Sequence, residues 1–213
     1  MTREPADRMP FRHPRLLAGS AAAGLATSYL VARTRPVPEW EIDLTRAINH
    51  VPGAGATALW PIMQLGSAWG PAVVAGGILV LLRDRLLAAT IFVTGMVTWF
   101  SAKGIKTLVS RGRPPAYITD IIVREGQGTG LGYVSGHSAV AAATAVVVAS
   151  ALPPRARPFA ALAAGAVGVA RIVHGVHLPA DVVGGWSFGI LTGLGGVWVM
   201  GTLRARRTSP AST

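Results

Sequence analysis

The sequence predicts an all-α, polytopic membrane protein built from six transmembrane helices. The first observation is composition: 51% of the 213 residues are hydrophobic, only 14% are charged, and the mean hydropathy is +0.46. Soluble domains carry about 25% charged residues. The second observation is distribution, because the apolar residues form long uncharged runs separated by short polar or basic stretches. Runs of about 17 to 25 apolar residues suffice to cross a bilayer as a helix.

The chain divides into three parts on this pattern. A basic N-terminal segment covers residues 1–15, a six-helix membrane domain covers 16–203, and a tail covers 204–213. The first uncharged run is 16–32. A cleaved signal peptide is an alternative interpretation of a basic start followed by an apolar run. The run just reaches spanning length, so we expect it to be the first transmembrane helix.

Five further helices follow a polar connector at 33–52, in which we expect a short interfacial helix. Their predicted ranges are 57–82, 86–102, 135–152, 159–176 and 182–203. Pro61 and Pro71 should kink the second helix. Gly185, Gly189 and Gly193 recur at four-residue spacing on the sixth, which would let helix backbones approach closely in lipid. The connector at 110–134 is rich in glycine and contains Pro-Pro, so it should be a loop.

The charge pattern predicts where the two ends lie. There are 20 Lys and Arg against nine Asp and Glu, a net charge of +11. Because the basic residues cluster between apolar runs, a membrane surface is favoured over nucleic acid as their partner. Six spans place both termini on one side, and that side is the more cationic. The positive-inside rule therefore puts both termini on the cytoplasmic side, with the loops after helices one, three and five facing outward. We expect the membrane to be a bacterial plasma membrane.

Three segments bring polar residues to that outward side. They are Lys106 and Arg113; Ser135, Gly136 and His137; and Arg171, His177 and Asp181. An ionisable group at the bilayer centre costs about 2.5 to 3.5 kcal/mol, so such residues are expected to have a function.

This combination of residue types is typical of phosphoryl chemistry. Lys and Arg stabilise charge on a transferring phosphoryl group, and the N–H groups that begin a helix at Gly136, capped by Ser135, bind anions. A neutral imidazole at His177 could attack phosphorus, with its ring oriented by Asp181. A protonated His137 could give a proton to the leaving oxygen. We expect two-step phosphomonoester hydrolysis with neither metal nor cofactor.

The same residues match three motifs of a known family. Lys106 to Pro114 reads Lys, six residues, Arg-Pro; residues 135–137 supply the core of Pro-Ser-Gly-His; and Arg171 to Asp181 reads Arg, five residues, His, three residues, Asp. The sequence resembles the type 2 phosphatidic acid phosphatase (PAP2) superfamily, which includes undecaprenyl-pyrophosphate phosphatases and vanadium haloperoxidases.

The resemblance implies a role for each matched position. His177 would be the nucleophile, Asp181 its support and His137 the acid. Lys106, Arg113, Arg171, Ser135 and Gly136 would hold the phosphate. Two positions depart from the motifs, since Val134 replaces a usual proline and Ala170 a usual serine.

Several alternatives remain open at this level. A non-catalytic lipid-phosphate binder would keep the cations but need neither histidine, a vanadate-dependent haloperoxidase would use the same cradle, and a transporter would place its site near the midplane. His174 with His177 and Asp181 could ligate a metal, although a pocket wall or a loop hydrogen bond is the expected role of His174. Arg111 and Lys103 are expected to be rim or headgroup cations, and His50 to lie in the first outer loop.

The preferred hypothesis is a phosphatase acting on a lipid phosphate at the outer leaflet. Its substrate would be phosphatidate-like or a polyprenyl phosphate or pyrophosphate. The pattern does not choose among these lipids, and it leaves the oligomeric state open.

Overall fold

The structure is a computed structural model that describes residues 9–126 and 128–208. The helices are α1 (Pro14–Arg33), α2 (Glu39–Asn49), α3 (Gly53–Met63), η2 (Gln64–Gly66), α4 (Gly70–Leu82), α5 (Arg85–Val109), η3 (Pro114–Ala116), α6 (Gly136–Ala151), η4 (Pro154–Ala156), α7 (Arg157–Val173) and α8 (Pro179–Thr208). Within the described ranges there is no β-strand, only an isolated bridge between Gly112 and Leu131. The prediction of an all-α protein is confirmed.

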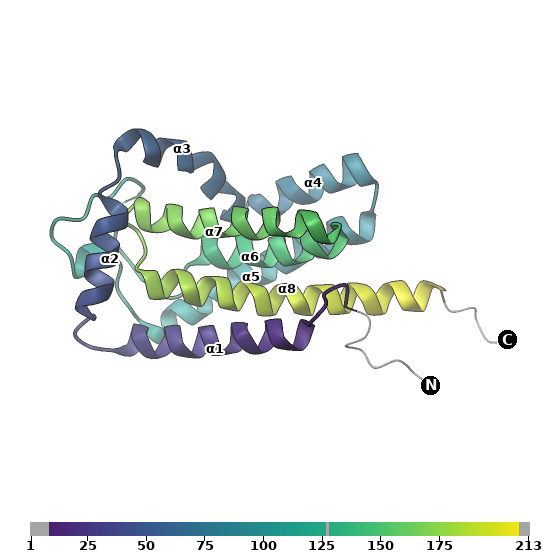
Figure 1. Cartoon of the computed structure of the whole chain (residues 1–213), viewed down its shortest axis with the longest axis horizontal. Helices are drawn as coiled ribbons and strands as arrows, with labels where there is room; N and C mark the ends of the chain where they lie inside the picture. The colour runs from purple at the N-terminus through teal and green to yellow at the C-terminus, as the bar shows by residue number, and fades with distance from the viewer. Residues whose placement is uncertain (1–8, 127, 209–213) are drawn as a thin grey trace.

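The long helices lie side by side along one axis, and α2 crosses one end of the bundle (Figure 1). Helix α6 lies at the centre, packed against α8, α5 and α7. Most of its 16 residues are alanine or valine, whose small side chains are mostly buried. Helix α1 begins, and α8 ends, at the end of the bundle opposite α2 (Figure 1).

The glycine stripe on α8 is the reason that α8 and α6 pack closely. A Cβ atom added at Gly189 would lie 2.1 Å from the backbone oxygen of Ala139, and one at Gly185 would lie 2.5 Å from that of Ser135. At Gly193 it would meet the side chain of Val146 at 2.7 Å. Larger residues at these positions would push the two backbones apart, as expected for small-residue contacts between membrane helices.

The second predicted helix is broken rather than kinked. Helices α3 and α4 meet at an angle of 74° across η2 and residues 67–69. Pro61 lies inside α3 and Pro71 in the first turn of α4, where its missing N–H costs nothing. The break also packs against the start of α6, because a Cβ atom at Gly66 would lie 2.3 Å from the backbone oxygen of His137.

The remaining elements follow the predicted order with shifted ends. The interfacial helix in the first connector is α2, and 110–134 is a loop that contains only η3. The third helix does not end at residue 102, as predicted, but continues to Val109. Helix α8 continues through residues 204–208 of the predicted tail. The outer parts of the two predicted terminal segments, 1–8 and 209–213, lie outside the described residues.

Length and composition identify the membrane-crossing helices. In the described part of the chain, α5, η4 with α7, and α8 are long and apolar enough to cross a bilayer, and the bent α3–α4 pair could form a fourth span. Helix α6 is apolar but has only 16 residues, and α1 does not reach the same hydropathy. The chain is a membrane-integral protein, and six spans stay a prediction.

Candidate active site

The three predicted motifs meet at the end of the bundle that α2 crosses. Ser135 caps the start of α6, and its backbone N–H donates to the backbone oxygen of Asp181 at 2.8 Å. Asp181 lies in the first turn of α8, four residues after His177 in the turn that joins α7 to α8. The second and third motifs are therefore in direct contact.

His177 and Asp181 form a buried pair. The Nδ1 atom of His177 lies 3.4 Å from Oδ2 of Asp181, and both side chains are at most 2% exposed. The same Oδ2 accepts a hydrogen bond from the backbone N–H of Leu178 at 3.0 Å. A side chain at Gly132 would collide with this carboxylate, since its Cβ atom would lie 2.6 Å from Oδ2. The carboxylate is held in one place beside the imidazole.

The surroundings of His177 favour its neutral form. Burial lowers the pKa of His177 well below its ordinary value, and the positive charges of Lys106, Arg171 and Arg113 lower it further. An imidazole can act as a nucleophile only when it is neutral. The cations that would attract a phosphate therefore also keep this ring unprotonated.

Lys106, Arg113 and Arg171 lie near His177, and both arginines have N–H donors without a partner among the described residues. Lys106 donates to the backbone oxygens of Leu131 at 3.1 Å and Gly132 at 2.6 Å, which ties the end of α5 to the loop. The buried Nε atoms of Arg113 and Arg171 have no hydrogen-bond partner among the described residues. A buried N–H left unpaired is costly, so an anion placed between these guanidinium groups would satisfy both.

Arg171 has a carboxylate neighbour that the sequence did not reveal. Its NH1 atom pairs with Glu125 and also approaches the sulfur of Met63 at 3.3 Å. Glu125 belongs to the loop between α5 and α6, and its side chain is 31% exposed. A phosphate that binds Arg171 must compete with this carboxylate.

His137 lies in the first turn of α6, in the same cluster. Its ring meets the ring of Trp99 edge-on, with centroids 5.7 Å apart and an angle of 68°. It interacts electrostatically with His177 and with the three cations. Gly136, at the first position of α6, packs against the same Trp99. The structure thus brings all eight predicted positions to one site.

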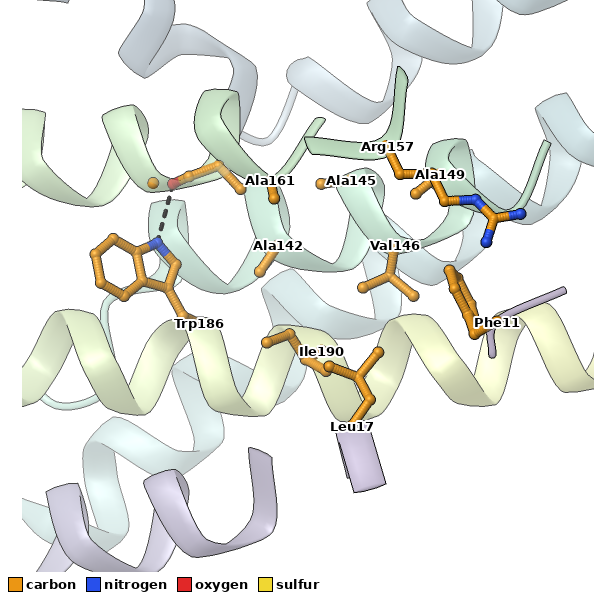
Figure 2. A pocket seen from close by; sticks show the side chains of 12 residues that line it. Phe11, Leu17, Ala142, Ala145, Val146, Ala149, Arg157, Ala161, Trp186 and Ile190 are labelled. Atoms are coloured by element: carbon orange, nitrogen blue, oxygen red, sulfur yellow. Dashed lines mark hydrogen bonds between the residues drawn. The ribbon is translucent and has the colours of Figure 1, made fainter. Parts of the chain in front are cut away.

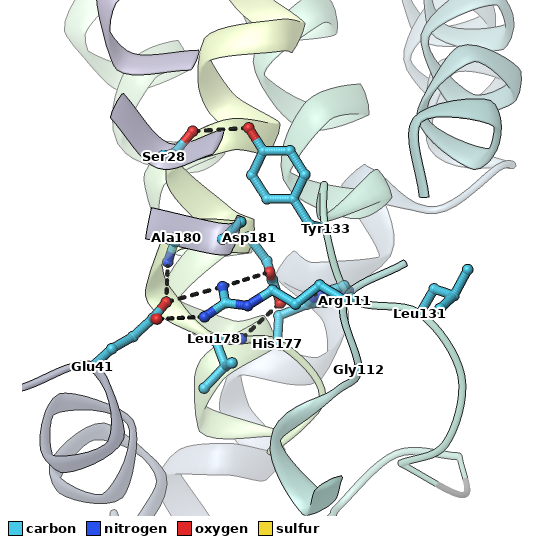
Figure 3. A network of polar contacts seen from close by, with 12 residues as sticks. Ser28, Glu41, Arg111, Gly112, Leu131, Tyr133, His177, Leu178, Ala180 and Asp181 are labelled. Atoms are coloured by element: carbon cyan, nitrogen blue, oxygen red, sulfur yellow. Dashed lines mark hydrogen bonds and ion pairs between the residues drawn. The ribbon is translucent and has the colours of Figure 1, made fainter. Parts of the chain in front are cut away.

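Arg111 is not the rim cation that the sequence suggested. Its side chain is fully buried, and it bridges two carboxylates (Figure 3). NH1 donates to Oε1 of Glu41 at 3.2 Å and to Oδ1 of Asp181 at 3.1 Å, while NH2 donates to Oε2 of Glu41 at 2.5 Å. Burial alone would lower the pKa of Arg111, but the bond to Glu41 and the two negative charges raise it. The guanidinium is held as a cation between the two acids.

Glu41 was missed because it lies in the polar connector, far from every motif. It lies on α2, and besides Arg111 it accepts a hydrogen bond from the backbone N–H of Ala180 at 2.8 Å. The side chain is fully buried. An acid in a connector is expected to face water, and only the fold reveals that α2 turns this one inward.

The other residues considered in the sequence analysis lie outside the cluster of the eight predicted positions. Lys103 is exposed over the rings of Trp99 and Phe100. His174 is buried at the end of α7, and its Nδ1 lies 2.8 Å from the backbone oxygen of Ala170 in the last turn of that helix. His50 is exposed at the end of α2. Across residues 9–126 and 128–208, no three His, Cys, Asp or Glu side chains gather as a metal site.

A separate apolar cavity of about 430 Å³ lies among α1, α6, α7 and α8 (Figure 2). Trp186 lies at one end, where its Nε1–H donates to the backbone oxygen of Ala164 at 2.9 Å, and Phe11 and Arg157 lie at the other. None of the eight predicted site residues lines it. The cavity can take an apolar chain, but the polar chemistry lies elsewhere.

Comparison with known proteins gives the family. Residues 85–205, more than half of the chain, match the family model of the PAP2 superfamily. A protein of Sulfolobus acidocaldarius named undecaprenyl-diphosphatase is 26% identical over 151 residues, which cover 70% of this chain and 73% of that protein.

Two crystal structures share the fold. The structure of Aquifex aeolicus LpxE matches with a TM-score of 0.66 and 22% identity, covering 72% of this chain and 92% of that one. A transmembrane PAP2-type phosphatidylglycerolphosphate phosphatase from Bacillus subtilis matches with a TM-score of 0.69 and 19% identity, covering 91% of this chain and 98% of that one. The matched segment contains all eight site positions, and the chain belongs to the PAP2 superfamily of phosphatases.

Proposed function

We propose that this protein is a lipid phosphate phosphatase that works through a phosphohistidine on His177, without a metal. One observation carries the proposal: a buried imidazole, held by Asp181, lies among the charges of Lys106, Arg113 and Arg171. A nucleophile, its orienting group and a cationic cradle are the parts that two-step phosphoryl transfer requires.

The first step forms a bond between nitrogen and phosphorus. Because Nδ1 of His177 faces Asp181, we assign the proton to Nδ1, which leaves the lone pair on Nε2 to attack. The bond between phosphorus and the leaving oxygen breaks as the new bond forms. His137 donates its proton to that oxygen, and the negative charge of a bound phosphate favours the protonated ring beforehand.

The second step returns the enzyme to its starting state. A water molecule attacks phosphorus, the bond to Nε2 breaks, and His137 takes the proton that the water releases. Inorganic phosphate leaves with the oxygen that came from water. Asp181 stays ionised throughout and offsets the positive charge that the phosphorylated ring carries.

The cradle binds the phosphate through both side chains and backbone. The buried Nε–H groups of Arg113 and Arg171 have no partner among the described residues and are available as donors. Lys106 adds a point charge, and the first N–H groups of α6, at Gly136 and beyond, add a helix N-terminus. Ser135 caps that helix through its side-chain oxygen, which accepts from the N–H of Ser138 at 3.4 Å.

The substrate class follows from the membrane setting. The site lies at the end of a bundle of membrane helices, so a phosphate on a lipid reaches it with its tail still in the bilayer. Two of the relatives are named for such substrates, as an undecaprenyl-diphosphatase and a phosphatidylglycerolphosphate phosphatase. We propose a phosphomonoester or pyrophosphate of a membrane lipid, either phosphatidate-like or polyprenyl, presented at the extracytoplasmic face of a bacterial plasma membrane.

The activity is tested by phosphate release from detergent-purified protein in EDTA. The panel contains phosphatidate, a polyprenyl monophosphate and a polyprenyl pyrophosphate, each assayed with wild type, His177→Ala and His50→Ala. We expect release by wild type and by His50→Ala, whose imidazole is exposed, and none by His177→Ala. Release that survives in His177→Ala, or that requires a metal, would contradict the proposal.

The orientation needs its own measurement. Helix α8 leads from the site to the opposite end of the bundle (Figure 1). If the site faces the extracytoplasmic side, a reporter fused after Arg207 should therefore lie in the cytoplasm. An extracytoplasmic reporter would invert the topology and place the site in the cytoplasm.

A further inference from the structure

The charged chain Glu41–Arg111–Asp181 lies behind the proposed nucleophile and does not belong to the phosphate cradle. Each of the three side chains is fully buried. Arg111 donates to both carboxylates, and Asp181 in turn lies against Nδ1 of His177 (Figure 3). The three residues come from α2, from the loop after α5 and from α8, so the network connects three segments that are distant in the sequence.

We propose that Glu41 and Arg111 are positioning residues that fix Asp181, and through it the ring of His177, for attack on phosphorus. The inference rests on the proposed function, since it assigns these two residues a part in the same reaction. It also identifies α2, which lies outside the segment matched to the family, as part of the working site.

The first argument is geometric. Asp181 uses Oδ2 for His177 and for the N–H of Leu178, and Oδ1 for Arg111. With both oxygens engaged, the carboxylate cannot rotate about its terminal bond without losing a contact. Glu41 holds the guanidinium by two hydrogen bonds, and it also binds the N–H of Ala180, the residue before Asp181. The anchor therefore reaches the aspartate through both side chain and backbone.

The second argument concerns charge. A single buried arginine against a single aspartate would form a closed ion pair, and the aspartate would offer little negative charge to a third group. Glu41 shares the charge of Arg111, so the three side chains together carry one net negative charge. That charge faces His177, whose ring becomes positive when it is phosphorylated. In a buried site such a fixed charge acts strongly because water does not screen it.

A purely structural role would produce a different outcome, which variants can separate. Glu41→Gln keeps the shape and removes the charge. Asp43→Asn is the matched control, because it makes the same change on the same helix at a side chain that is 73% exposed. Glu41→Gln leaves Arg111 its contact with Asp181, so the protein should still fold. Arg111→Lys is the second variant, because it keeps the positive charge between the two acids but loses the planar fork that reaches both.

The first readout is independent of turnover. NMR of nitrogen-labelled histidine observes the five rings of the protein, and His177→Ala assigns the signal of interest. We expect one tautomer for His177 in wild type and in Asp43→Asn, and a mixture of tautomers in Glu41→Gln. This measurement decides the inference even if the protein releases no phosphate from the lipids tested, in which case the proposed function alone would fail.

The second readout is kinetic. Glu41→Gln should lower kcat by about ten-fold or more with KM and inhibition by inorganic phosphate nearly unchanged, because the cradle is intact. Arg111→Lys should show the same loss of kcat, and thermal unfolding in detergent checks that both variants are folded. A single wild-type tautomer in folded Glu41→Gln, or a kcat that falls only as far as the folded fraction falls, would overturn the inference.

Discussion

Two arginine–carboxylate pairs flank the site, and they differ in how firmly they are closed. In the inner pair, Arg111 and Glu41 are both fully buried and joined by two hydrogen bonds. In the outer pair, Arg171 is 5% exposed and Glu125 is 31% exposed. The inner pair also contacts Asp181, whereas Arg171 of the outer pair approaches the sulfur of Met63, and the Nε atoms of both arginines have no partner among the described residues.

The backbone around each acid explains the difference. Glu41 is held within helix α2, while Glu125 precedes Gly126 and lies close to Gly128, whose φ angles of +62° and +65° are readily adopted only by glycine. A closed buried pair is costly to open, whereas a pair whose acid reaches water is partly screened and is easier to exchange. In the proposed mechanism the same chemistry would serve two purposes, because the inner pair would fix the nucleophile and the outer pair would give way to a phosphate.

The largest expected effect is the loss of the proton donor, His137. It can be distinguished from the loss of the positioning residue Glu41 by a change of leaving group. His137→Gln should lower kcat about 10² to 10⁴-fold on a lipid monophosphate, where the leaving alkoxide needs a proton. The loss should shrink on an aryl phosphate, whose leaving group is stable without one. Glu41→Gln should lose the same factor on both substrates, since it acts on the nucleophile. Equal losses for His137→Gln on both substrates would remove His137 as the acid.

The next effect concerns stability. Arg111→Met leaves two buried carboxylates without their partner and should cost about 3 to 5 kcal/mol of unfolding free energy. Arg171→Met opens a pair that is partly in water and should cost about 1 kcal/mol or less. Chemical denaturation in detergent measures both. Similar losses for the two variants would mean that the pairs are not closed to different degrees.

Loss of the outer acid should improve phosphate binding. Glu125→Gln removes the carboxylate that competes for Arg171, so inorganic phosphate should inhibit about two- to ten-fold more tightly. Asp120→Asn is the matched control, because it removes an acid of the same loop that pairs instead with Arg46. Weaker inhibition in Glu125→Gln would show that this carboxylate helps to hold the phosphate cradle together.

The smallest effect is a shift in pH dependence. Burial and three cations lower the pKa of His177, so its neutral form should persist below the ordinary histidine value of about 6.5. Activity should fall only at more acidic pH, and Arg113→Gln should move this limb upward by about half a pH unit because one cation is lost. A kcat/KM profile whose acid limb lies at or above about pH 6.5 would contradict the lowered pKa of His177.

The same shift has a consequence for folding. Between the lowered pKa and about 6.5, the unfolded chain binds a proton at His177 that the folded protein excludes. The contribution of this group to stability is thus complete above about pH 6.5 and is lost as the pH falls toward the folded pKa. His177→Ala should reduce the acid sensitivity of unfolding over that range.

Local signals were sufficient to predict most of the helices and the convergence of the three motifs. Ser135 begins α6 as a cap, and glycine spacing marks the α6–α8 contact, because such features depend on neighbours in the sequence. The break between α3 and α4 was expected as a kink. Its sharpness comes from Gly66 packing on the backbone of His137, a contact between segments about 70 residues apart that no local pattern encodes.

Neither the inner acid, Glu41, nor the outer acid, Glu125, could be predicted, because each pairs with an arginine that is distant in the sequence. Glu41 pairs with an arginine 70 positions away, and its own surroundings in the sequence are those of an exposed connector. Arg111 and Arg113 are only two residues apart, yet Arg111 is buried behind His177 and Asp181, whereas Arg113 is one of the proposed phosphate ligands. Hydropathy cannot decide this, because both arginines carry the same charge and only the fold of the loop directs them differently.

Trapping the phosphorylated protein tests directly whether His177 forms a phosphohistidine. Wild type is mixed with a lipid phosphate, quenched in base during the first turnover and digested, and the peptides are mapped by mass spectrometry. We expect one added phosphoryl group on the peptide that contains His177. It should be absent from His177→Ala and present in His50→Ala. A phosphoryl group on another residue, or first-turnover phosphate release with no phosphorylated peptide at any quench time, would contradict this expectation.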